Sequence, residues 1–215
     1  MKDSYKFLGP IYKIGCFLVS GNALSRCRIS QFANIKAGDK ILIAGVGPGD
    51  DALYAAQIGA HVTVVDISQT MLKEFSKLIS SQKYSGTIRA LSLDILHFQE
   101  QDQFDYVVAN FFLNVFSKEK MKIILKHLIQ QAKPGGKIIV SDFAYSKGNF
   151  LIKFLQNMYW YCIVSVFWLF AGNAFHKIEN YEEVMEDVSL TILSQKHTAF
   201  LFIPFFTSLL GEKKT

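Results

Sequence analysis

Short apolar runs alternate with helical stretches through the middle of the chain. The runs are KILIAG (residues 40–45), HVTVVDI (61–67), TIRALSL (87–93), FDYVVAN (104–110) and GKIIVSDF (136–143), and the helical stretches cover 50–58, 68–79 and 117–132. Strands that are apolar on both faces and separated by helices are typical of a parallel sheet. The pattern therefore predicts a doubly wound, Rossmann-like α/β fold. The sequence PGG after residue 133 is expected to end the last of these helices.

The end of the chain continues with two more apolar runs. The stretch SLTILSQKHTAFLFIPFF reads as two strands joined near Lys196 and His197. Such a hairpin would add antiparallel strands at one edge of the sheet. The expected fold is thus a mainly parallel, seven-stranded sheet with an antiparallel C-terminal hairpin strand.

The length of 215 residues favours a single domain. We expect it to span residues 1–215 and to consist of four segments. These are an N-terminal helical cover (1–38), a cofactor-binding core (39–146), an apolar helical insertion (147–187) and a C-terminal strand hairpin (188–215).

Composition narrows the class of protein. Half of the residues are hydrophobic and 19% are charged, and the mean hydropathy is +0.21, which excludes intrinsic disorder. The net charge of +5 comes from scattered Lys and Arg residues that never form a run of five. A nucleic-acid partner is therefore not favoured, whereas attraction to an anionic membrane surface is consistent with the charge.

The three cysteines, Cys16, Cys27 and Cys162, are an odd number without metal-binding spacing, which argues against a disulfide framework or a zinc site. We therefore expect no metal site and a reducing, cytoplasmic compartment. The short apolar stretch near the N-terminus is interrupted by Gly15 and Gly21, which argues against a signal peptide.

A glycine-rich loop follows the first predicted strand. Gly45, Gly47 and Gly49 stand between a strand and a helix, where glycine lets the backbone turn sharply and approach a nucleotide-like ligand. Asp66 ends the next strand, seventeen residues after the last of these glycines. A carboxylate there can accept hydrogen bonds from both hydroxyls of a ribose. Its alternative role is to cap the following helix, although Ser68 is available for that.

Two acidic residues distinguish between cofactor classes. Asp50 and Asp51 open the helix after the loop, and their charges would repel the pyrophosphate of a dinucleotide. They are compatible with a ligand that has no phosphate and carries a cationic amine, such as S-adenosylmethionine.

From the glycine loop to the turn AKPGG, the chain resembles the class I S-adenosylmethionine-dependent methyltransferases. The resemblance rests on AGVGPG, VVDIS, SQTML, LSLDIL, FDYVVANFFLNVF and AKPGGKIIVSDF, in the family's order over about residues 35–145. It implies that the three glycines line the methionine moiety of the cofactor and that Asp66 holds its ribose. It further implies that Ile67 flanks the adenine and that Asp94 and Ile95 recognise the adenine amino group.

The chain departs from this family at two positions. Ala44 precedes the first glycine, where the family commonly has an acid that helps to bind the cofactor's ammonium group. Either Asp50 or Asp51 takes over that contact, with Asp51 the candidate to test, or cofactor binding is weakened or altered. In VVANFF, phenylalanines replace the prolines of the motif NPP[YF], which weakens the case for protein-amide and nucleic-acid substrates. Asn110 in this motif either contacts substrate or cofactor or satisfies the local backbone.

Methyl transfer needs positioning and exclusion of water more than a fixed catalytic dyad, so the catalytic residues are not defined by the sequence. Candidate bases are Asp142, His176, Tyr5, Tyr12 and His97. Asp142 ends the fifth strand and could instead serve as a cap. His176 could lie at the surface and the tyrosines could serve in packing, and His97 is expected near the adenine or in solvent.

Residues 154–175 carry no charged side chain and would form a helix of about 33 Å. Three interpretations remain open: a membrane span, a helix that walls an apolar cleft, or a core helix or dimer face. Gly172 is expected to end the helix. Together with the aromatic N-terminal segment, this layout resembles that of quinone-biosynthesis methyltransferases and related enzymes of small or lipid molecules.

The sequence thus predicts methylation of a hydrophobic small molecule, such as a quinone precursor or a lipid. We expect a cytoplasmic monomer or homodimer that touches a membrane surface peripherally and does not bind nucleic acid. The alternatives are a protein that binds S-adenosylmethionine or its product without methylating, an NAD-linked oxidoreductase, and a methyltransferase of protein or nucleic acid.

Overall fold

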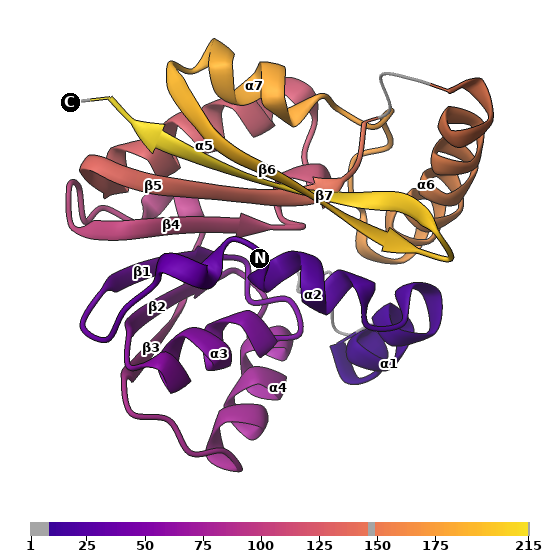
Figure 1. The fold of residues 1–215 in the computed structure, drawn as a ribbon. Coiled ribbons are helices and arrows are strands. Elements are labelled where there is room, and N and C mark those ends of the chain that lie inside the picture. Colours follow the sequence, from indigo (N-terminus) through magenta and orange to yellow (C-terminus); the bar gives the residue numbers. More distant parts are fainter. Residues whose placement is uncertain (1–8, 146–148, 215) are drawn as a thin grey trace.

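The structure, a computed structural model that describes residues 9–145 and 149–214, is built on one seven-stranded sheet (Figure 1). The strand order is β3-β2-β1-β4-β5-β7-β6, with the first five strands parallel and the last two antiparallel. The strands are β1 (Lys40–Ala44), β2 (His61–Asp66), β3 (Thr87–Ser92), β4 (Phe104–Asn110), β5 (Ala132–Phe143), β6 (Leu190–Phe200) and β7 (Ile203–Lys213). The predicted α/β fold with a mainly parallel sheet is confirmed.

Helices cover both faces of the sheet. One face carries α3 (Asp50–Ile58) and α4 (Gln69–Ser80), and the other carries α5 (Lys118–Gln131) and α7 (Tyr181–Asp187) (Figure 1). Short 3-10 turns, η1 (Phe32–Asn34), η2 (Ile95–His97) and η3 (Leu113–Val115), connect these elements.

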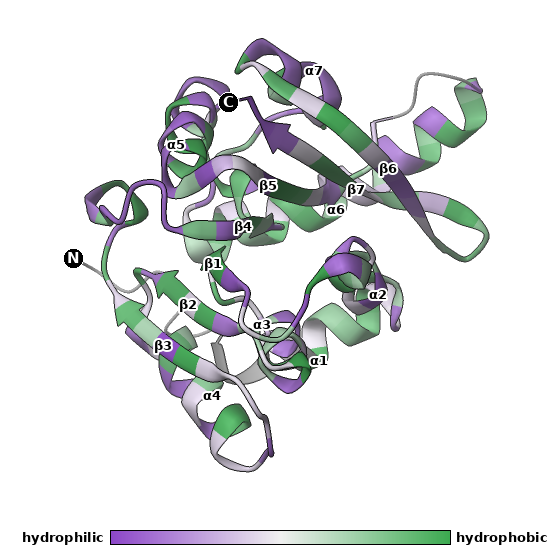
Figure 2. Ribbon diagram, turned by 60° about the vertical axis from the view of Figure 1, so that its left-hand side comes forward, coloured by the Kyte–Doolittle hydropathy of each residue, from purple (hydrophilic) through white to green (hydrophobic). Residues whose placement is uncertain are grey.

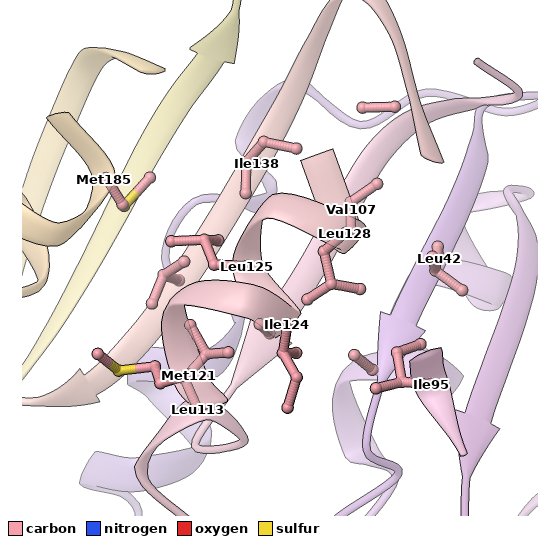
Figure 3. Close-up of a cluster of buried hydrophobic side chains, with 14 of the residues drawn as sticks. Leu42, Ile95, Val107, Leu113, Met121, Ile124, Leu125, Leu128, Ile138 and Met185 are labelled. Atoms are coloured by element: carbon pink, nitrogen blue, oxygen red, sulfur yellow. The ribbon is translucent and has the colours of Figure 1, made fainter. Parts of the chain in front are cut away.

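The core on the α5 face shows why the apolar pattern forms these elements. Ile124, Leu125 and Leu128 follow one another at helical spacing on α5 and are fully buried. They face Val107 of β4 and Ile138 of β5 (Figure 3). The helix begins at Ser117, whose side chain accepts a hydrogen bond from the backbone N–H of Lys120 and so satisfies a free donor of the first turn.

Three elements gather at the end of the molecule where the parallel strands finish. They are α1 (Gly9–Ser20), α2 (Ala23–Ile29) and α6 (Phe150–Ala171), which lie near the closed end of the β6–β7 hairpin (Figure 1). The hydroxyl of Tyr159 on α6 donates a hydrogen bond to the Val19 carbonyl on α1, at 2.9 Å. Gly172 caps α6 in the left-handed conformation, as expected.

The C-terminal hairpin turns later than the sequence predicted. The expected turn near Lys196 and His197 is wrong, because both residues lie within β6 and pair with β7. The chain turns at Leu201 and Phe202 instead, and the pair Phe200 and Ile203 closes the turn. Lys196 and His197 are polar because β6 is the exposed edge strand of the sheet. The actual turn consists of apolar residues, which are not typical of turns.

Two further boundaries differ from the sequence pattern. The stretch AKPGG, expected to end a helix as a turn, lies inside the extended segment of β5, which starts at Ala132. A register shift opposite Phe104 and Tyr106 accommodates these extra residues. The apolar helix α6 begins at Phe150, before the uncharged stretch, because the Asn149 side chain caps it by accepting from the Leu151 N–H.

Candidate functional site

The glycine loop lies at the carboxyl end of β1 and enters α3. Gly45, Gly47 and Gly49 have φ values of +76°, +50° and +79°, a region that side chains other than glycine rarely adopt. A Cβ atom at Gly45 would lie 2.5 Å from the ring of Phe112, and one at Gly47 would lie 2.7 Å from Arg28 Nη2. Backbone conformation and close packing therefore both require glycine in this loop.

Asp66 ties the glycine loop to the end of β2. Its Oδ2 atom accepts a hydrogen bond from the Val46 N–H, and its Oδ1 atom accepts from the Ser68 N–H, both at 2.8 Å. Ser68 itself caps α4 by accepting from the Met71 N–H at 3.2 Å. The ribose contact stays a prediction.

The residues predicted to surround adenine lie at the ends of neighbouring strands. The Ile67 side chain is half exposed directly after β2. Asp94 follows β3, and its Oδ1 atom accepts from the Leu96 N–H at 3.0 Å, which caps η2. The Ile95 side chain is buried in the core against Leu42, so only its backbone can face a ligand. The adenine contacts remain predictions.

A buried polar cluster joins three elements next to the glycine loop. Asp51 on α3 is fully buried, and its Oδ2 atom lies 3.4 Å from Arg28 Nη1 of α2. The side chain of Asn110, at the end of β4, donates to the same Asp51 oxygen at 2.8 Å and to the Arg28 carbonyl at 3.1 Å. The cluster thus ties the N-terminal cover to the sheet.

This cluster has unused hydrogen-bonding capacity. Arg28 is only 1% exposed, and its guanidinium lies 5.4 Å from the centre of the Phe111 ring. Within the described part of the chain, Arg28 Nε and Asn110 Oδ1 have no hydrogen-bond partner. A buried donor on a cation and a buried acceptor beside a glycine loop fit a ligand that carries both a carboxylate and an ammonium group. The amino-acid part of S-adenosylmethionine has both groups, so Arg28 and Asn110 fit this part of the cofactor.

Sequence reasoning missed Arg28. One available signal was its position four residues after Leu24 and next to Cys27, both of which are buried on α2. A charged residue on the apolar face of a short helix needs a partner. Asp51, predicted to bind the cofactor ammonium, is engaged by Arg28, by Asn110 and, through Oδ1, by the N–H of Ala52. Its role toward the cofactor stays a prediction.

An apolar pocket of about 260 Å³ opens at the carboxyl ends of β4 and β5. Aromatic side chains line it from both strands and from α6, while α1 and α2 supply its other wall. Its lining includes Tyr12, Gly15, Cys16, Val19, Leu24, Phe111, Asn114, Phe143, Tyr159, Trp160 and Val164. Phe111 links this pocket to the buried cluster, because the same ring faces Arg28.

Asp142 is buried near the end of β5 and is not placed as a helix cap. Its Oδ1 atom accepts from Asn114 Nδ2 and from the Phe143 N–H, both at 2.8 Å. Burial raises the pKa of Asp142 to about 6, although these hydrogen bonds, Tyr181 and the charge of His176 act to lower it. Asn114 lines the pocket, so its hydrogen bond connects Asp142 to the pocket wall.

The remaining candidate bases have separate environments. The ring nitrogens of His176 lie 2.7 Å from the Lys177 carbonyl and 2.9 Å from the Asn114 carbonyl, so the ring is anchored and does not line the pocket. Tyr12 lines the pocket and packs edge-on against Phe167. His97 lies in η2. Tyr5 is outside the described residues.

A larger cavity of about 430 Å³ lies between α6, α7 and β7. Gln156, Glu179 and Tyr181 line it, and no residue of the glycine loop does. It is therefore not the cofactor site. Among residues 9–145 and 149–214, no group of three metal-ligating side chains comes together.

Comparison with known proteins agrees with this geometry. Residues 41–136 match the sequence profile of the family described as "Methyltransferase domain". The chain is 31% identical over 127 residues to a demethylmenaquinone methyltransferase of Clavibacter sepedonicus, covering 59% of this chain and 50% of that protein. It is 26% identical over 197 residues to a ubiquinone/menaquinone biosynthesis C-methyltransferase of Wigglesworthia glossinidia brevipalpis, covering 87% and 73%. The chain thus spans only half the length of the first of these relatives.

Solved structures show the same fold. A 1,6-didemethyltoxoflavin-N1-methyltransferase of Burkholderia thailandensis, with bound S-adenosylhomocysteine, superposes with a TM-score of 0.72. It is 16% identical, and the match covers 99% of this chain and 87% of the other. A magnesium protoporphyrin IX methyltransferase of Synechocystis, also with S-adenosylhomocysteine, gives a TM-score of 0.63 at 20% identity, with 97% and 88% covered.

Proposed function

We propose that the chain is a class I S-adenosylmethionine-dependent methyltransferase, as its profile match, its relatives and its fold support, and that it transfers a methyl group from S-adenosylmethionine to an apolar small molecule. The observation that carries this proposal is the apolar pocket at the carboxyl ends of β4 and β5. Open α/β sheets bind their ligands at this edge. The chain's own residues must then bind and orient both reactants and exclude water around the methyl group that the cofactor supplies.

On the cofactor side, each polar group has a partner in this proposal. Asp66 accepts from the ribose hydroxyls, and Asp94 recognises the adenine amino group. Arg28 binds the cofactor carboxylate, since its guanidinium is buried against Gly47 and retains a free donor. The unpartnered Oδ1 atom of Asn110 accepts from the ammonium group, a contact that would compensate for Ala44.

On the substrate side, the pocket favours a planar apolar ring. The rings of Phe143 and Trp160 lie 4.7 Å apart between centroids, and Tyr12 closes the other wall. The pocket is small for a drug-sized ligand, and a quinone precursor or the ring-sized part of a lipid matches its size and polarity. The names of two relatives, which refer to menaquinone and ubiquinone biosynthesis, support this substrate class.

Binding without methyl transfer is the second candidate, because Ala44 lacks the usual acid. A thermal-shift experiment with S-adenosylhomocysteine and with NADH tests the cofactor class. A ligand at one hundred times its Kd stabilises the native state by about 2.7 kcal/mol, so S-adenosylhomocysteine should raise the melting temperature clearly. Stabilisation by NADH alone would overturn the proposal.

Incubation with a membrane-lipid extract and methyl-labelled S-adenosylmethionine then separates an enzyme from a binder. We expect label in an organic-soluble product. Binding of S-adenosylhomocysteine without labelled product would favour the second candidate. We place this activity in the cytoplasm.

A further inference from the structure

The end of the molecule that holds the apolar pocket also carries most of its exposed hydrophobic surface. We call this surface the apolar end and define it by α1, α6 and the turn between β6 and β7 (Figure 1). The three parts are contiguous, because Tyr159 of α6 bonds to Val19 of α1 at 2.9 Å and packs against Phe200 of β6. Figure 2 colours much of α6 and the tip of the hairpin as hydrophobic.

Large apolar side chains point into solvent along all three parts. They are Ile14, Phe17, Leu18, Phe150, Leu151, Phe154, Met158, Trp168, Leu169, Phe170, Leu201 and Phe202. Soluble monomers rarely expose contiguous apolar patches larger than a few hundred Å². A patch formed by three separate segments therefore indicates a surface that is covered in use.

The turn between β6 and β7 carries exposed apolar residues although its backbone conformation disfavours them. Leu201 and Phe202 have φ values of +50° and +66°. Two-residue turns with both φ values positive strongly favour Asn and Gly, and apolar residues there are strained. Yet Leu201 is 71% exposed and Phe202 is fully exposed. Packing within the chain does not explain why apolar residues occupy this turn. Contact with an apolar phase outside the protein would explain it.

The distribution of charged residues indicates what kind of partner covers the apolar end. The apolar end contains no Asp or Glu, and neither do the described sequence segments around it, residues 9–38, 149–178 and 188–211. Their charged residues are all Lys or Arg, and Arg26, Lys153 and Lys177 are exposed. Such a basic, apolar surface matches an anionic lipid bilayer, which attracts cations and accepts apolar side chains.

Contacts with the body show how α6 would meet a membrane. The helix is long and apolar enough to cross a bilayer, with 22% of its most apolar window buried. However, the Gln156 side chain donates to the Pro204 carbonyl and Trp160 Nε1 donates to the His176 carbonyl, each at 2.7 Å. These bonds hold α6 along the sheet, so it lies at the interface instead of leaving the body to span.

We propose that the apolar end docks on the surface of an anionic lipid bilayer, with Leu201 and Phe202 entering its apolar layer. The docking does not depend on the methyl-transfer proposal. If both hold, an apolar substrate reaches the pocket directly from the membrane, because α1 and α6 form both the pocket wall and the docking surface.

Vesicle flotation of the full chain, without cofactor or substrate, tests the proposal. We expect flotation with phosphatidylcholine vesicles that contain 30% phosphatidylglycerol, and weaker flotation with phosphatidylcholine alone or at high salt. The double substitution Leu201→Asn/Phe202→Gly should weaken partitioning at least about tenfold, since two side chains lose apolar burial. The same change should raise the melting temperature, because it relieves the strained turn.

Two further variants complete the design. Leu169→Asn/Phe170→Asn on the last turn of α6 should also reduce flotation, and Ile123→Asn on α5, exposed but outside the apolar end, should not. Unchanged flotation of both double variants would overturn the proposal, as would absence of flotation by the unmodified chain. A dimer that these variants dissociate, without vesicle binding, would show that a second copy covers the surface.

Discussion

Arg28 connects the N-terminal cover with the glycine loop. A buried guanidinium is costly unless it is paired and hydrogen-bonded, and here it has one carboxylate at 3.4 Å and an unpartnered Nε atom. A ligand carboxylate would complete the pairing. This would explain why a charged residue occupies the apolar face of α2, and Arg28 is the residue that our proposal adds to the predicted cofactor site.

We predict that Arg28→Met combined with Asp51→Asn weakens binding of S-adenosylhomocysteine about tenfold or more. The double change removes both charges together, so no buried charge is left unpaired and stability should change little. The ligand loses its charge-assisted hydrogen bonds to the guanidinium. Isothermal titration calorimetry measures the affinity.

A matched ligand provides the control for this prediction. 5′-Methylthioadenosine has the same adenosine but lacks the amino-acid carboxylate, so its affinity should be unchanged by the double substitution. An equal loss of affinity for both ligands would mean that Arg28 shapes the loop and does not bind the carboxylate.

Asp142 makes stability depend on pH. Burial raises its pKa from 3.8 to about 6, so between these values the folded chain binds more protons than the unfolded chain. The free energy of unfolding therefore falls as pH rises through this window. Asp142→Asn keeps an oxygen for the Asn114 and Phe143 donors and should stabilise the chain by about 1–3 kcal/mol at pH 7.5. Urea unfolding should show almost no gain in the free energy of unfolding from this substitution at pH 4. An equal gain at pH 4 and pH 7.5 would show that the raised pKa of Asp142 is not its cause.

At the scale of elements, the sequence predicted the helices, strands and loops whose formation depends on residues close together in the chain. The five parallel strands, α3, α4 and the glycine loop follow from apolar period, caps and turn chemistry, and they lie where expected except that β5 begins earlier, at Ala132. The turn at Leu201 and Phe202 could not be predicted, because its residues oppose the usual turn preference. The cluster of Arg28, Asp51 and Asn110 joins residues far apart in sequence, which a local pattern does not encode.

Helix α1 offers a direct test of the substrate pocket. Gly15 lines the pocket, and a Cβ atom there would meet no atom within 4 Å. Gly15→Leu should therefore extend a side chain into the pocket from an unobstructed Cβ position, and it should stabilise α1 by up to about 1 kcal/mol because glycine is a poor helix former. We expect methyl transfer to the apolar substrate to fall at least about tenfold, measured as labelled organic-soluble product.

Gly15→Ala is the control for this change. It gains helix propensity but fills little of the pocket, so stability should rise while activity stays close to that of the unmodified chain. Binding of S-adenosylhomocysteine should be unaffected in both variants. If the alanine variant loses as much activity as the leucine variant, flexibility of α1, not pocket volume, limits the reaction.

At the scale of the whole molecule, the high hydropathy has a definite location. The sheet and its helices form two ordinary cores, and the excess apolar surface lies on α1, α6 and the hairpin turn. The acidic residues are absent from the segments that carry this surface. The modest net charge of +5 therefore understates the charge asymmetry between the apolar end and the rest of the chain.

The cofactor should also strengthen the connection between α2 and the glycine loop. The buried cluster links α2 to the glycine loop and β4. A bound carboxylate on Arg28 must be released before α2 can open, so S-adenosylhomocysteine at one hundred times its Kd should slow amide hydrogen exchange in α2 about one hundredfold. Exchange in α5, which packs on the face of the sheet opposite α3, should change little. 5′-Methylthioadenosine should protect the glycine loop but not α2, and equal protection of α2 by both ligands would show that the carboxylate does not couple the cover to the sheet.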